Sequence, residues 1–427
     1  MNRRVLIISP YFAPSNAADM QRIRMSLPYF KQFGWGADVV VVDDKYSEMI
    51  KDDLLLQSIP IDINIYKVDA LSKNLTSKVG LGSLALRSMW YYLKAVNKLL
   101  KATKYDLVYF STTQFPVTIL GAYWKRKFKV PYIIDIQDPW HSEYYQDKPK
   151  DQRPAKYWFS YRLNKYLEPV AMKQINGLIS VSKGYIDDLK YRYPTIKNIP
   201  AVTIPFGAFK PDLQIAIDNK PFFKPLLDPA YKNIVYIGRG GADMQPALNT
   251  IFTALKSCLN KNPELFKTIR LYFIGTSYAP AGQGKPTILQ IAQECGVAEN
   301  VIELTDRISY YHTLATLQQA DALLMPGSDD PQYTASKIYP YLLTNKPLLA
   351  IFNSKSPALN VLKEYDTPFA YSYDEDKNVQ EKISAFFSNI ADATMAAPNY
   401  NPDATQKYSA ENMTKLQCRF FEEVIGS

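Results

Sequence analysis

Residues 234–241, with the sequence IVYIGRGG, decide the fold. The apolar, partly β-branched start of this stretch predicts a buried strand, and its glycines predict a tight turn. An amphipathic helical pattern follows over residues 246–260. A strand that passes through a short turn into a helix is the repeating unit of a parallel α/β sheet. We therefore expect the same unit to recur along the chain.

Short β-branched runs separated by helix-length segments do recur in both halves of the sequence. The strands expected in the first half are residues 5–9, 38–42, 63–66, 107–111, 132–136, 178–181 and 202–204. Those expected in the second half are residues 234–237, 269–274, 301–304, 322–325, 348–351 and 369–371. Two α/β domains in tandem, each doubly wound and Rossmann-like, are the simplest account of this rhythm.

The domain boundary is predicted where prolines accumulate. Five of them lie between Pro205 and Pro229, in a stretch with few apolar runs, which is typical of a linker. We expect an N-terminal domain over residues 1–207, a second domain over residues 208–400 and a C-terminal segment over residues 401–427. The last segment has a helical pattern over residues 409–425 whose apolar side fits either domain.

Composition narrows the class of protein. Apolar residues make up 47% of the 427-residue chain and charged residues 21%, which excludes a disordered protein. Three scattered cysteines suggest neither a disulfide framework nor a zinc site. Apolar runs reach only about ten residues, against the roughly 20 that span a bilayer, and two early prolines interrupt the N-terminal run. These features favour a cytoplasmic protein.

Glycines indicate where a ligand binds in the second domain. Gly238, Arg239, Gly240 and Gly241 follow an expected strand, where backbone amides approach an anion and Arg239 contacts a phosphate. The alternative is a plain turn with Arg239 in solvent. Two neighbouring strand ends should line the same crevice; they contribute Thr276, Arg307 and Ile308. Alternatively, Arg307 forms an ion pair with Asp306 alone and contacts no ligand.

A second turn follows the strand at residues 322–325 and contains Asp330 and Tyr333. Ser336 is a candidate helix N-cap, which places Lys337 in the first helical turn. A cation is unfavourable there unless an anion binds, so Lys337 is a second candidate phosphate ligand. The alternative is a surface lysine that points into solvent.

Asp138, Trp140 and His141 follow the strand at residues 132–136 in the first domain. A carboxylate, an indole and an imidazole at a strand end can orient a sugar hydroxyl or stack on a sugar ring. Alternatively, Asp138 caps the next segment and Trp140 packs in the core.

Several ordered fragments together resemble bacterial GT-B glycosyltransferases of the family 4 type, particularly those of polysaccharide pathways. The fragments are residues 9–14 with Gln21 and Arg22, residues 33–35, 135–140, 180–182, 204–207, 236–238, 336–341 and 345–347. The resemblance covers nearly the whole chain. It implies a GT-B fold with two domains that face a cleft, and a C-terminal helix that crosses back to the first domain.

The resemblance also implies an activity. It implies retaining, metal-independent transfer from a nucleoside-diphosphate sugar of the UDP or GDP type to a glycan or lipid-linked acceptor, without a further cofactor. It assigns the acceptor side to Ala17, Ala18, Arg22 and Trp140, and donor binding to the glycine turn with Tyr333, Ser336 and Lys337. Catalytic roles fall to Asp138, His141 and Asp330.

Two departures from the family pattern limit these expectations. Residues 15–18 read Ser-Asn-Ala-Ala where the family usually has glycines. Gln332 and Pro340 occupy the positions of two glutamates, of which the later one holds the nucleotide ribose; Asp329 or Asp330 are possible substitutes. A catalytically inactive scaffold therefore stays open as an alternative. A sugar-nucleotide epimerase is a second alternative, because it shares the two-domain form. A dehydrogenase does not fit, because neither domain has a G-x-G-x-x-G turn.

The net charge of +9 points to anionic partners. No block of basic residues suggests nucleic acid. One stretch, residues 86–104, interleaves lysines with apolar residues and is a candidate helix for peripheral binding to an anionic membrane. The alternative is a crossover helix with its apolar side on the sheet and its lysines in water.

Overall fold

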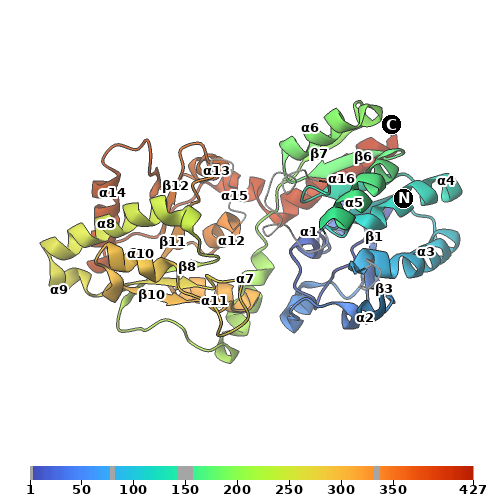
Figure 1. The fold of residues 1–427 in the computed structure, drawn as a ribbon. Coiled ribbons are helices and arrows are strands. Elements are labelled where there is room, and N and C mark those ends of the chain that lie inside the picture. Colours follow the sequence, from blue (N-terminus) through green and yellow to red (C-terminus); the bar gives the residue numbers. More distant parts are fainter. Residues whose placement is uncertain (1–2, 77–81, 142–156, 331–336, 427) are drawn as a thin grey trace. The chain divides into compact units, whose positions relative to one another are not determined.

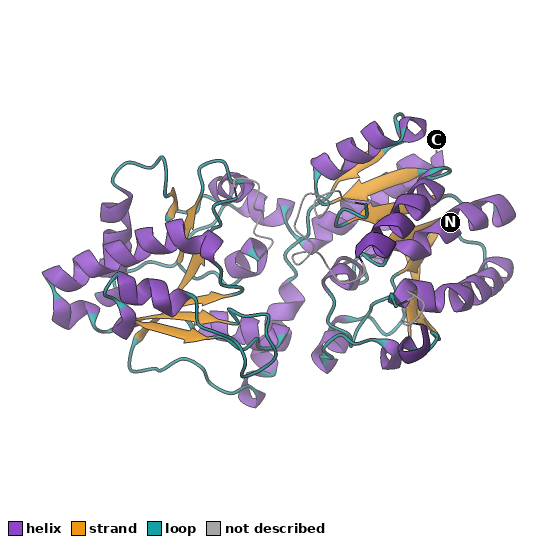
Figure 2. Ribbon diagram, viewed as in Figure 1, coloured by secondary structure: helices purple, strands orange, loops and turns teal. Residues whose placement is uncertain are grey.

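The computed structural model describes residues 3–76, 82–141, 157–330 and 337–426. The chain folds into two compact units (Figure 1). Unit 1 comprises Met1–Gly207 and Ser409–Ser427, and unit 2 comprises Ala208–Tyr408. Each unit is an α/β layered structure with helices on both faces of one sheet (Figure 2).

Unit 1 contains a seven-stranded sheet in the order β3-β2-β1-β4-β5-β6-β7, in which every neighbouring pair is parallel. Its strands are β1 (Arg3–Ile8), β2 (Trp35–Val42), β3 (Asn64–Val68), β4 (Leu107–Ser111), β5 (Tyr132–Ile136), β6 (Gly177–Ser180) and β7 (Ala201–Thr203). Because β1 lies beside both β2 and β4, the winding reverses between β1 and β4, and side chains that follow these strands meet at one edge.

Helices cover both faces of this sheet. They are α1 (Gln21–Ser26), α2 (Lys73–Thr76), α3 (Leu84–Ala102), α4 (Ile119–Phe128), α5 (Tyr157–Met172), α6 (Lys183–Arg192) and α16 (Ala410–Gly426). Apolar side chains of α3, α4, α5 and α6 form one core with the sheet, as Tyr92, Trp124, Met172 and Leu189 illustrate.

Helix α16 belongs to unit 1 although it ends the chain. Phe421 of this helix lies with its ring centroid 5.3 Å from that of Trp35 and 5.1 Å from that of Tyr109. Gly177 makes the close approach possible, because a Cβ there would lie 2.7 Å from Val424 Cγ2. The packing explains the apolar side expected for residues 409–425.

Unit 2 contains a six-stranded parallel sheet in the order β10-β9-β8-β11-β12-β13. Its strands are β8 (Lys232–Ile237), β9 (Ile269–Ile274), β10 (Val301–Leu304), β11 (Ala322–Pro326), β12 (Leu348–Phe352) and β13 (Ala370–Ser372). Its helices are α7 (Lys210–Asp218), α8 (Gln245–Lys261), α9 (Pro263–Phe266), α10 (Ile288–Glu294), α11 (Tyr310–Gln319), α12 (Ile338–Leu343), α13 (Pro357–Glu364), α14 (Val379–Ala391) and α15 (Pro402–Lys407). The winding of this sheet reverses between β8 and β11.

The prediction of two doubly wound α/β domains is confirmed. The interpretation of residues 205–229 as a mere linker is wrong, since this stretch contains α7. Pro211 lies in the first turn of α7, where its missing amide costs no hydrogen bond. Asp212 is buried and accepts hydrogen bonds from the hydroxyls of Tyr310 and Tyr311, at 3.0 and 2.9 Å. These contacts attach α7 to α11 of unit 2.

Among the described residues, no helix combines the length and the apolar character needed to cross a bilayer.

Candidate functional site

A pocket of about 360 Å³ opens at the carboxyl edge of the unit 2 sheet, beside the point where the winding reverses. Gly238, Arg239, Arg307, Ile308 and Lys337 line it, and all five were predicted as donor ligands. They come from the turns after β8, β10 and β11. The pocket therefore collects three cationic side chains from segments that lie far apart in the sequence.

Lys337 is the most enclosed of these cations. Its ammonium donates a hydrogen bond to the Tyr236 hydroxyl at 3.1 Å and lies 4.6 Å from the centroid of that ring. Burial, together with the smaller effect of the positive charges of Arg239 and Arg307, lowers the pKa of Lys337 to about 8. Among the described residues, no carboxylate forms an ion pair with Lys337. The ammonium is therefore placed to receive an anion.

Gly238 makes room for this ammonium. A Cβ at position 238 would collide with Lys337 Nζ, so a side chain there would displace the lysine from the pocket. The turn is fixed by two backbone hydrogen bonds, from Gly238 N to Ile274 O at 2.9 Å and from Gly240 N to Thr276 O at 2.8 Å. The glycines at 238 and 240 thus connect the ends of β8 and β9.

Arg239 is held by a bidentate ion pair with Asp243, with N–O distances of 2.8 and 2.6 Å. The Arg239 guanidinium lowers the pKa of Asp243, which keeps this carboxylate ionised. A phosphate that contacts Arg239 would meet a guanidinium already fixed in place. Gly241 precedes Asp243 by two residues, and a Cβ at 241 would press on the Asp243 carboxylate.

Arg307 lies over the ring of Tyr278, 4.8 Å from its centroid. The alternative partner, Asp306, instead accepts a hydrogen bond from the Gly282 amide at 2.9 Å. Tyr278 is 73% exposed, so the aromatic ring and the guanidinium together form an open stacking platform at one end of the pocket.

Thr276 lies behind the pocket, and its side chain is buried. Its hydroxyl donates to Glu303 at 2.6 Å, and Glu303 also accepts the amides of Thr287, Ile288 and Leu289 at 2.7–3.1 Å. These amides begin α10 and have no partner within that helix. Glu303 therefore fixes the start of α10 and the end of β9 together.

The change Glu303→Gln should loosen this attachment, because an amide oxygen accepts more weakly than a carboxylate. We expect a loss of roughly 1–2 kcal/mol in unfolding free energy. Hydrogen exchange should accelerate at the amides of residues 287–289. Glu299→Gln, at an exposed position in the same unit, is the matched control. Unchanged protection at residues 287–289 would contradict the role of Glu303.

The second predicted turn is described only in part. Tyr333, Ser336 and Gln332 lie outside the described residues. Asp329 and Asp330 are exposed, and their amides bond to Asp243 O at 2.7 Å and to Ser328 Oγ at 3.2 Å. Helix α12 begins at Ile338, one residue later than the predicted first turn, so Lys337 is its N-cap residue. Pro340 lies at the third helical position, where it removes no intrahelical hydrogen bond.

A larger pocket, about 560 Å³, lies at the carboxyl edge of the unit 1 sheet. Asp138 and Trp140 line it, together with Thr113 and the first turns of α3 and α5. Partial burial raises the pKa of Asp138, and the charge of Asp19 raises it further. A carboxyl group with a raised pKa in an open pocket is suited to exchange a proton with a ligand.

Trp140 and His141 are both largely enclosed. Trp140 stacks on Phe115 at 5.4 Å and donates its indole N–H to Asn164 at 3.2 Å. His141 packs against Tyr161 at 4.8 Å, and its amide donates to Glu168 Oε2 at 3.0 Å. Trp140 thus packs in the core and also lines the pocket.

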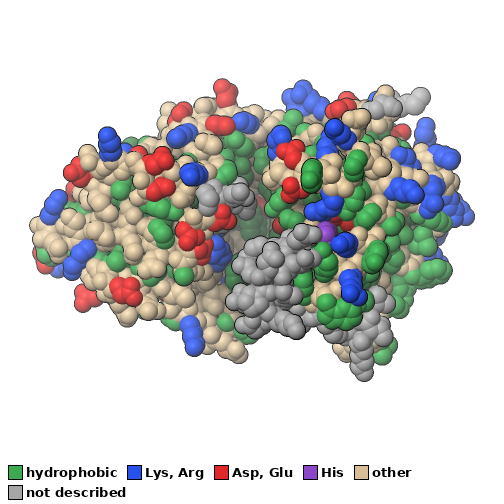
Figure 3. Space-filling model, turned by 45° about the horizontal axis from the view of Figure 1, so that its top comes forward, with side chains coloured by type: hydrophobic (Ala, Val, Ile, Leu, Met, Phe, Trp, Pro, Cys, Tyr) green, Lys and Arg blue, Asp and Glu red, His purple; other side chains and the backbone are tan. Residues whose placement is uncertain are grey.

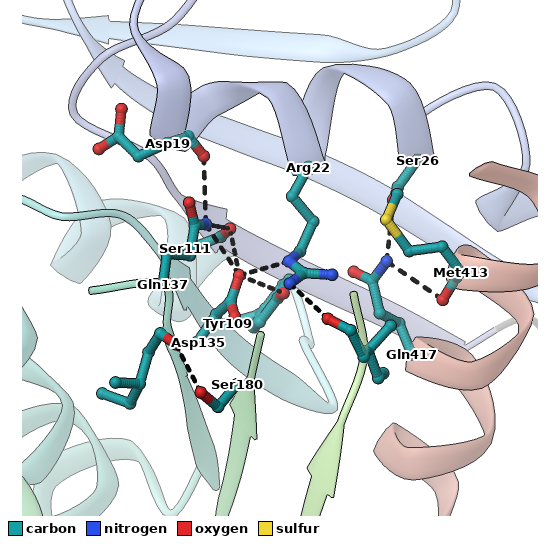
Figure 4. A network of polar contacts seen from close by, with 12 residues as sticks. Asp19, Arg22, Ser26, Tyr109, Ser111, Asp135, Gln137, Ser180, Met413 and Gln417 are labelled. Carbon is teal, nitrogen blue, oxygen red and sulfur yellow. Dashed lines mark hydrogen bonds and ion pairs between the residues drawn. The ribbon is translucent and has the colours of Figure 1, made fainter. Parts of the chain in front are cut away.

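Arg22 lies in a buried network rather than on the pocket wall (Figure 4). Its guanidinium forms an ion pair with Asp135 at 2.7 Å, with both side chains fully buried, and donates to Ile204 O at 2.8 Å. Asp135 also accepts from Ser111 at 3.0 Å and from Gln137 at 2.9 Å. The network therefore joins α1 to the ends of β4, β5 and β7.

Ala17 and Ala18 lie just before this network. Ala17 is buried, whereas Ala18 is exposed and begins a short 3-10 turn that leads into α1. In the same turn, Asp19 accepts hydrogen bonds from Thr112 Oγ1 at 3.0 Å and from the Thr113 amide at 2.8 Å. Burial raises the pKa of Asp19.

Four residues that shape these sites were not among the predicted ones: Tyr236, Asp243, Glu303 and Asp19. Asp243 follows Arg239 by four residues and pairs with it across the glycine turn. That spacing brings side chains together in an α-helix and not in a turn, so it gave no signal here. The other three act through contacts between segments far apart in the sequence, for which the sequence carries no local signal.

Comparison with known proteins identifies the architecture. No protein-family profile matches the sequence, and no curated protein matches it. Three of the solved structures that match illustrate the likeness, and each covers nearly the full chain. They are the N-terminal domain of Candida albicans trehalose-6-phosphate phosphatase (TM-score 0.57, 12% identity, 99% of this chain and 97% of that one), Staphylococcus aureus TarM (0.54, 11%, 98% and 99%) and a UDP-forming trehalose-phosphate synthase from Burkholderia xenovorans (0.53, 12%, 99% and 99%). At this identity the likeness shows the fold alone, and the fold is GT-B.

Proposed function

We propose that the chain is a glycosyltransferase that moves a sugar from a nucleoside-diphosphate sugar to a glycan or lipid-linked acceptor. Unit 2 would hold the donor and unit 1 the acceptor. The family 4 resemblance supports transfer with retention and without a metal ion. Among the similar structures, TarM was solved with UDP and alpha-GlcNAc-glycerol, which agrees with a donor of the UDP type.

The observation that carries the proposal is the cationic pocket of unit 2. Lys337, Arg239 and Arg307 converge there beside glycine turns, and Lys337 is enclosed without a carboxylate partner among the described residues. Enclosing an ammonium costs free energy, which a bound diphosphate would offset. The exposed Tyr278 ring offers a surface on which a nucleobase can stack.

Calorimetry with UDP, GDP, ADP and dTDP tests the donor site. We expect at least one of them to bind with a dissociation constant below about 1 mM, which corresponds to roughly 4 kcal/mol. Binding should persist in EDTA if no metal is required. Absence of binding to all four at millimolar concentration would refute the donor role of unit 2.

Asp138 is the proposed general base toward the acceptor hydroxyl, and its raised pKa gives a pH prediction. The base must be ionised, so the transfer rate should rise with pH through an ionisation above the ordinary aspartate value of about 3.9. Asp19→Asn removes a nearby negative charge, so the rising limb of the pH–rate profile should then move to lower pH. Asp138→Asn should remove the limb and leave diphosphate affinity unchanged. A limb that stays in place in Asp19→Asn would contradict the assignment.

A further inference from the structure

Three helices of unit 1 carry almost all of the net charge of the protein. Helices α3, α4 and α5 contain nine lysines and arginines and a single acidic residue, Glu168. These nine positive residues and one negative residue give the three helices a net charge of +8, compared with +9 for the whole chain. The rest of the protein is close to neutral. The positive charge is therefore concentrated on one part of the molecule.

These helices lie on the same face of the unit 1 sheet, with α4 in contact with both α3 and α5. An Asn97 amide contacts the Tyr123 hydroxyl at 3.5 Å and links α3 to α4. The one acidic residue, Glu168, adds no negative charge to the outer side of these helices, because it is buried and paired with Arg192 of α6 at 2.5 Å. We call the outer side of α3, α4 and α5 the basic face.

Most cations of the basic face point into solvent. Lys94, Lys98 and Lys101 follow one side of α3 at three- and four-residue spacings and are exposed. Arg126 and Lys127 are exposed on α4. None of these five forms an ion pair with a described residue. The right side of Figure 3, over α3 and α4, shows basic and hydrophobic side chains together.

Large aromatic side chains accompany the cations. Trp90 of α3 is 68% exposed, and Trp158 and Tyr166 of α5 are 65% and 75% exposed. Arg162 lies over the Trp158 ring at 6.0 Å. Exposed tryptophan and tyrosine beside lysine and arginine are typical of surfaces that rest on the headgroup layer of a membrane. Contact with water alone does not account for three large aromatic side chains exposed on one face.

The unit 1 pocket adjoins the basic face. Its wall includes Ser83 and Leu86 at the start of α3 and Phe159 and Leu163 at the start of α5. Helices α3 and α5 thus contribute both to the pocket and to the basic face. An acceptor carried on a lipid would reach the pocket from a bilayer bound at this face. This link to the acceptor rests on the proposed function; the charge and aromatic arguments do not.

We infer that the basic face docks on an anionic lipid surface. Its partner is a bilayer whose headgroups carry negative charge. Each basic residue near such a surface contributes about 1 kcal/mol, or roughly fivefold in partitioning. The exposed aromatic rings add contacts within the headgroup layer.

Cosedimentation of the full chain with vesicles tests this inference. We expect binding to vesicles that contain phosphatidylglycerol, weakening as salt is added, and little binding to phosphatidylcholine alone. The combined variant Lys94→Glu, Lys98→Glu, Arg126→Glu and Lys165→Glu should bind more than about a hundredfold more weakly, from roughly fivefold per charge. Trp90→Ala should weaken binding with no change in net charge.

A matched variant controls for net charge. Lys261→Glu, Lys285→Glu, Lys363→Glu and Lys377→Glu change four exposed lysines of unit 2 by the same total charge. This control should retain vesicle binding. Equal losses in both variants, or equal binding to neutral and anionic vesicles, would overturn the inference. Tighter binding to soluble heparin than to vesicles would also overturn it and indicate a polyanion partner.

Calorimetry with UDP separates this test from the proposed function. Both variants should melt at the wild-type temperature and keep wild-type nucleotide affinity, because none of their substitutions lies in the unit 2 pocket. Loss of vesicle binding with intact UDP binding would then report on the basic face alone. Absence of UDP binding in the wild type would refute the donor site and leave the vesicle result standing.

Discussion

Lys337→Ala is expected to weaken binding of a nucleoside diphosphate by roughly tenfold to a hundredfold, or about 1.5–3 kcal/mol. The ammonium is enclosed beside Gly238 and Tyr236, so its interaction with a phosphate is screened little by water. Folding should be retained, because the alanine removes an enclosed charge that no carboxylate offsets among the described residues. Calorimetry with the best-binding diphosphate measures the change.

The pH dependence of diphosphate affinity is a second, independent measurement of the role of Lys337. With a pKa of about 8, Lys337 loses its proton as the pH rises above that value. Only the protonated form attracts phosphate, so wild-type affinity should fall between about pH 8 and pH 10. The Lys337→Ala variant should lack this fall, and Lys363→Ala, an exposed lysine elsewhere in unit 2, should retain it. An unchanged affinity in Lys337→Ala would refute the phosphate role.

The sheets were predictable because their strands are short and almost wholly buried. In a parallel sheet covered on both faces, a strand appears as a continuous apolar run, and the runs at residues 107–111, 132–136 and 269–274 match β4, β5 and β9 residue for residue. Turn glycines and prolines then mark where each run ends. The local signal and the tertiary structure agree at these positions, which is why the topology could be anticipated.

Helix α7 was missed because the local signal and the tertiary structure disagree there. Prolines at 205, 211 and 221 suggested an irregular linker, yet Pro211 occupies the helical turn that tolerates it. The stabilising contact is the hydrogen bonding of Asp212 to Tyr310 and Tyr311, about a hundred residues away. A polar residue whose partners are so distant in sequence gives no periodic signal.

The candidate site was predictable in position and only partly in detail. Side chains that follow β8, β10 and β11 must lie at one edge, so Gly238, Arg307 and Lys337 were foreseeable as neighbours. The direction in which each side chain points could not be predicted. Thr276 points to Glu303, and Arg22 points into the core; each direction depends on a partner from another segment.

Arg22 gives the largest expected effect on stability. Arg22→Met should lower the free energy of unfolding by about 3–5 kcal/mol, because it leaves the Asp135 carboxylate buried without its cation. It also removes the hydrogen bond to Ile204 O and the contact with the Phe206 ring, 4.8 Å from the guanidinium. Urea unfolding followed by a probe in unit 1 measures the loss. Arg126→Met, at an exposed position, should change stability by less than about 0.5 kcal/mol.

The double variant Arg22→Met with Asp135→Asn distinguishes a structural ion pair from a ligand contact. If the two side chains stabilise each other, neutralising both should lower the free energy of unfolding by less than the sum of the two single changes. Diphosphate affinity in unit 2 should stay at the wild-type value throughout, since neither residue lines that pocket. A wild-type stability in Arg22→Met, combined with loss of transfer to the acceptor, would contradict the buried role. It would return Arg22 to the acceptor site that the resemblance assigned to it.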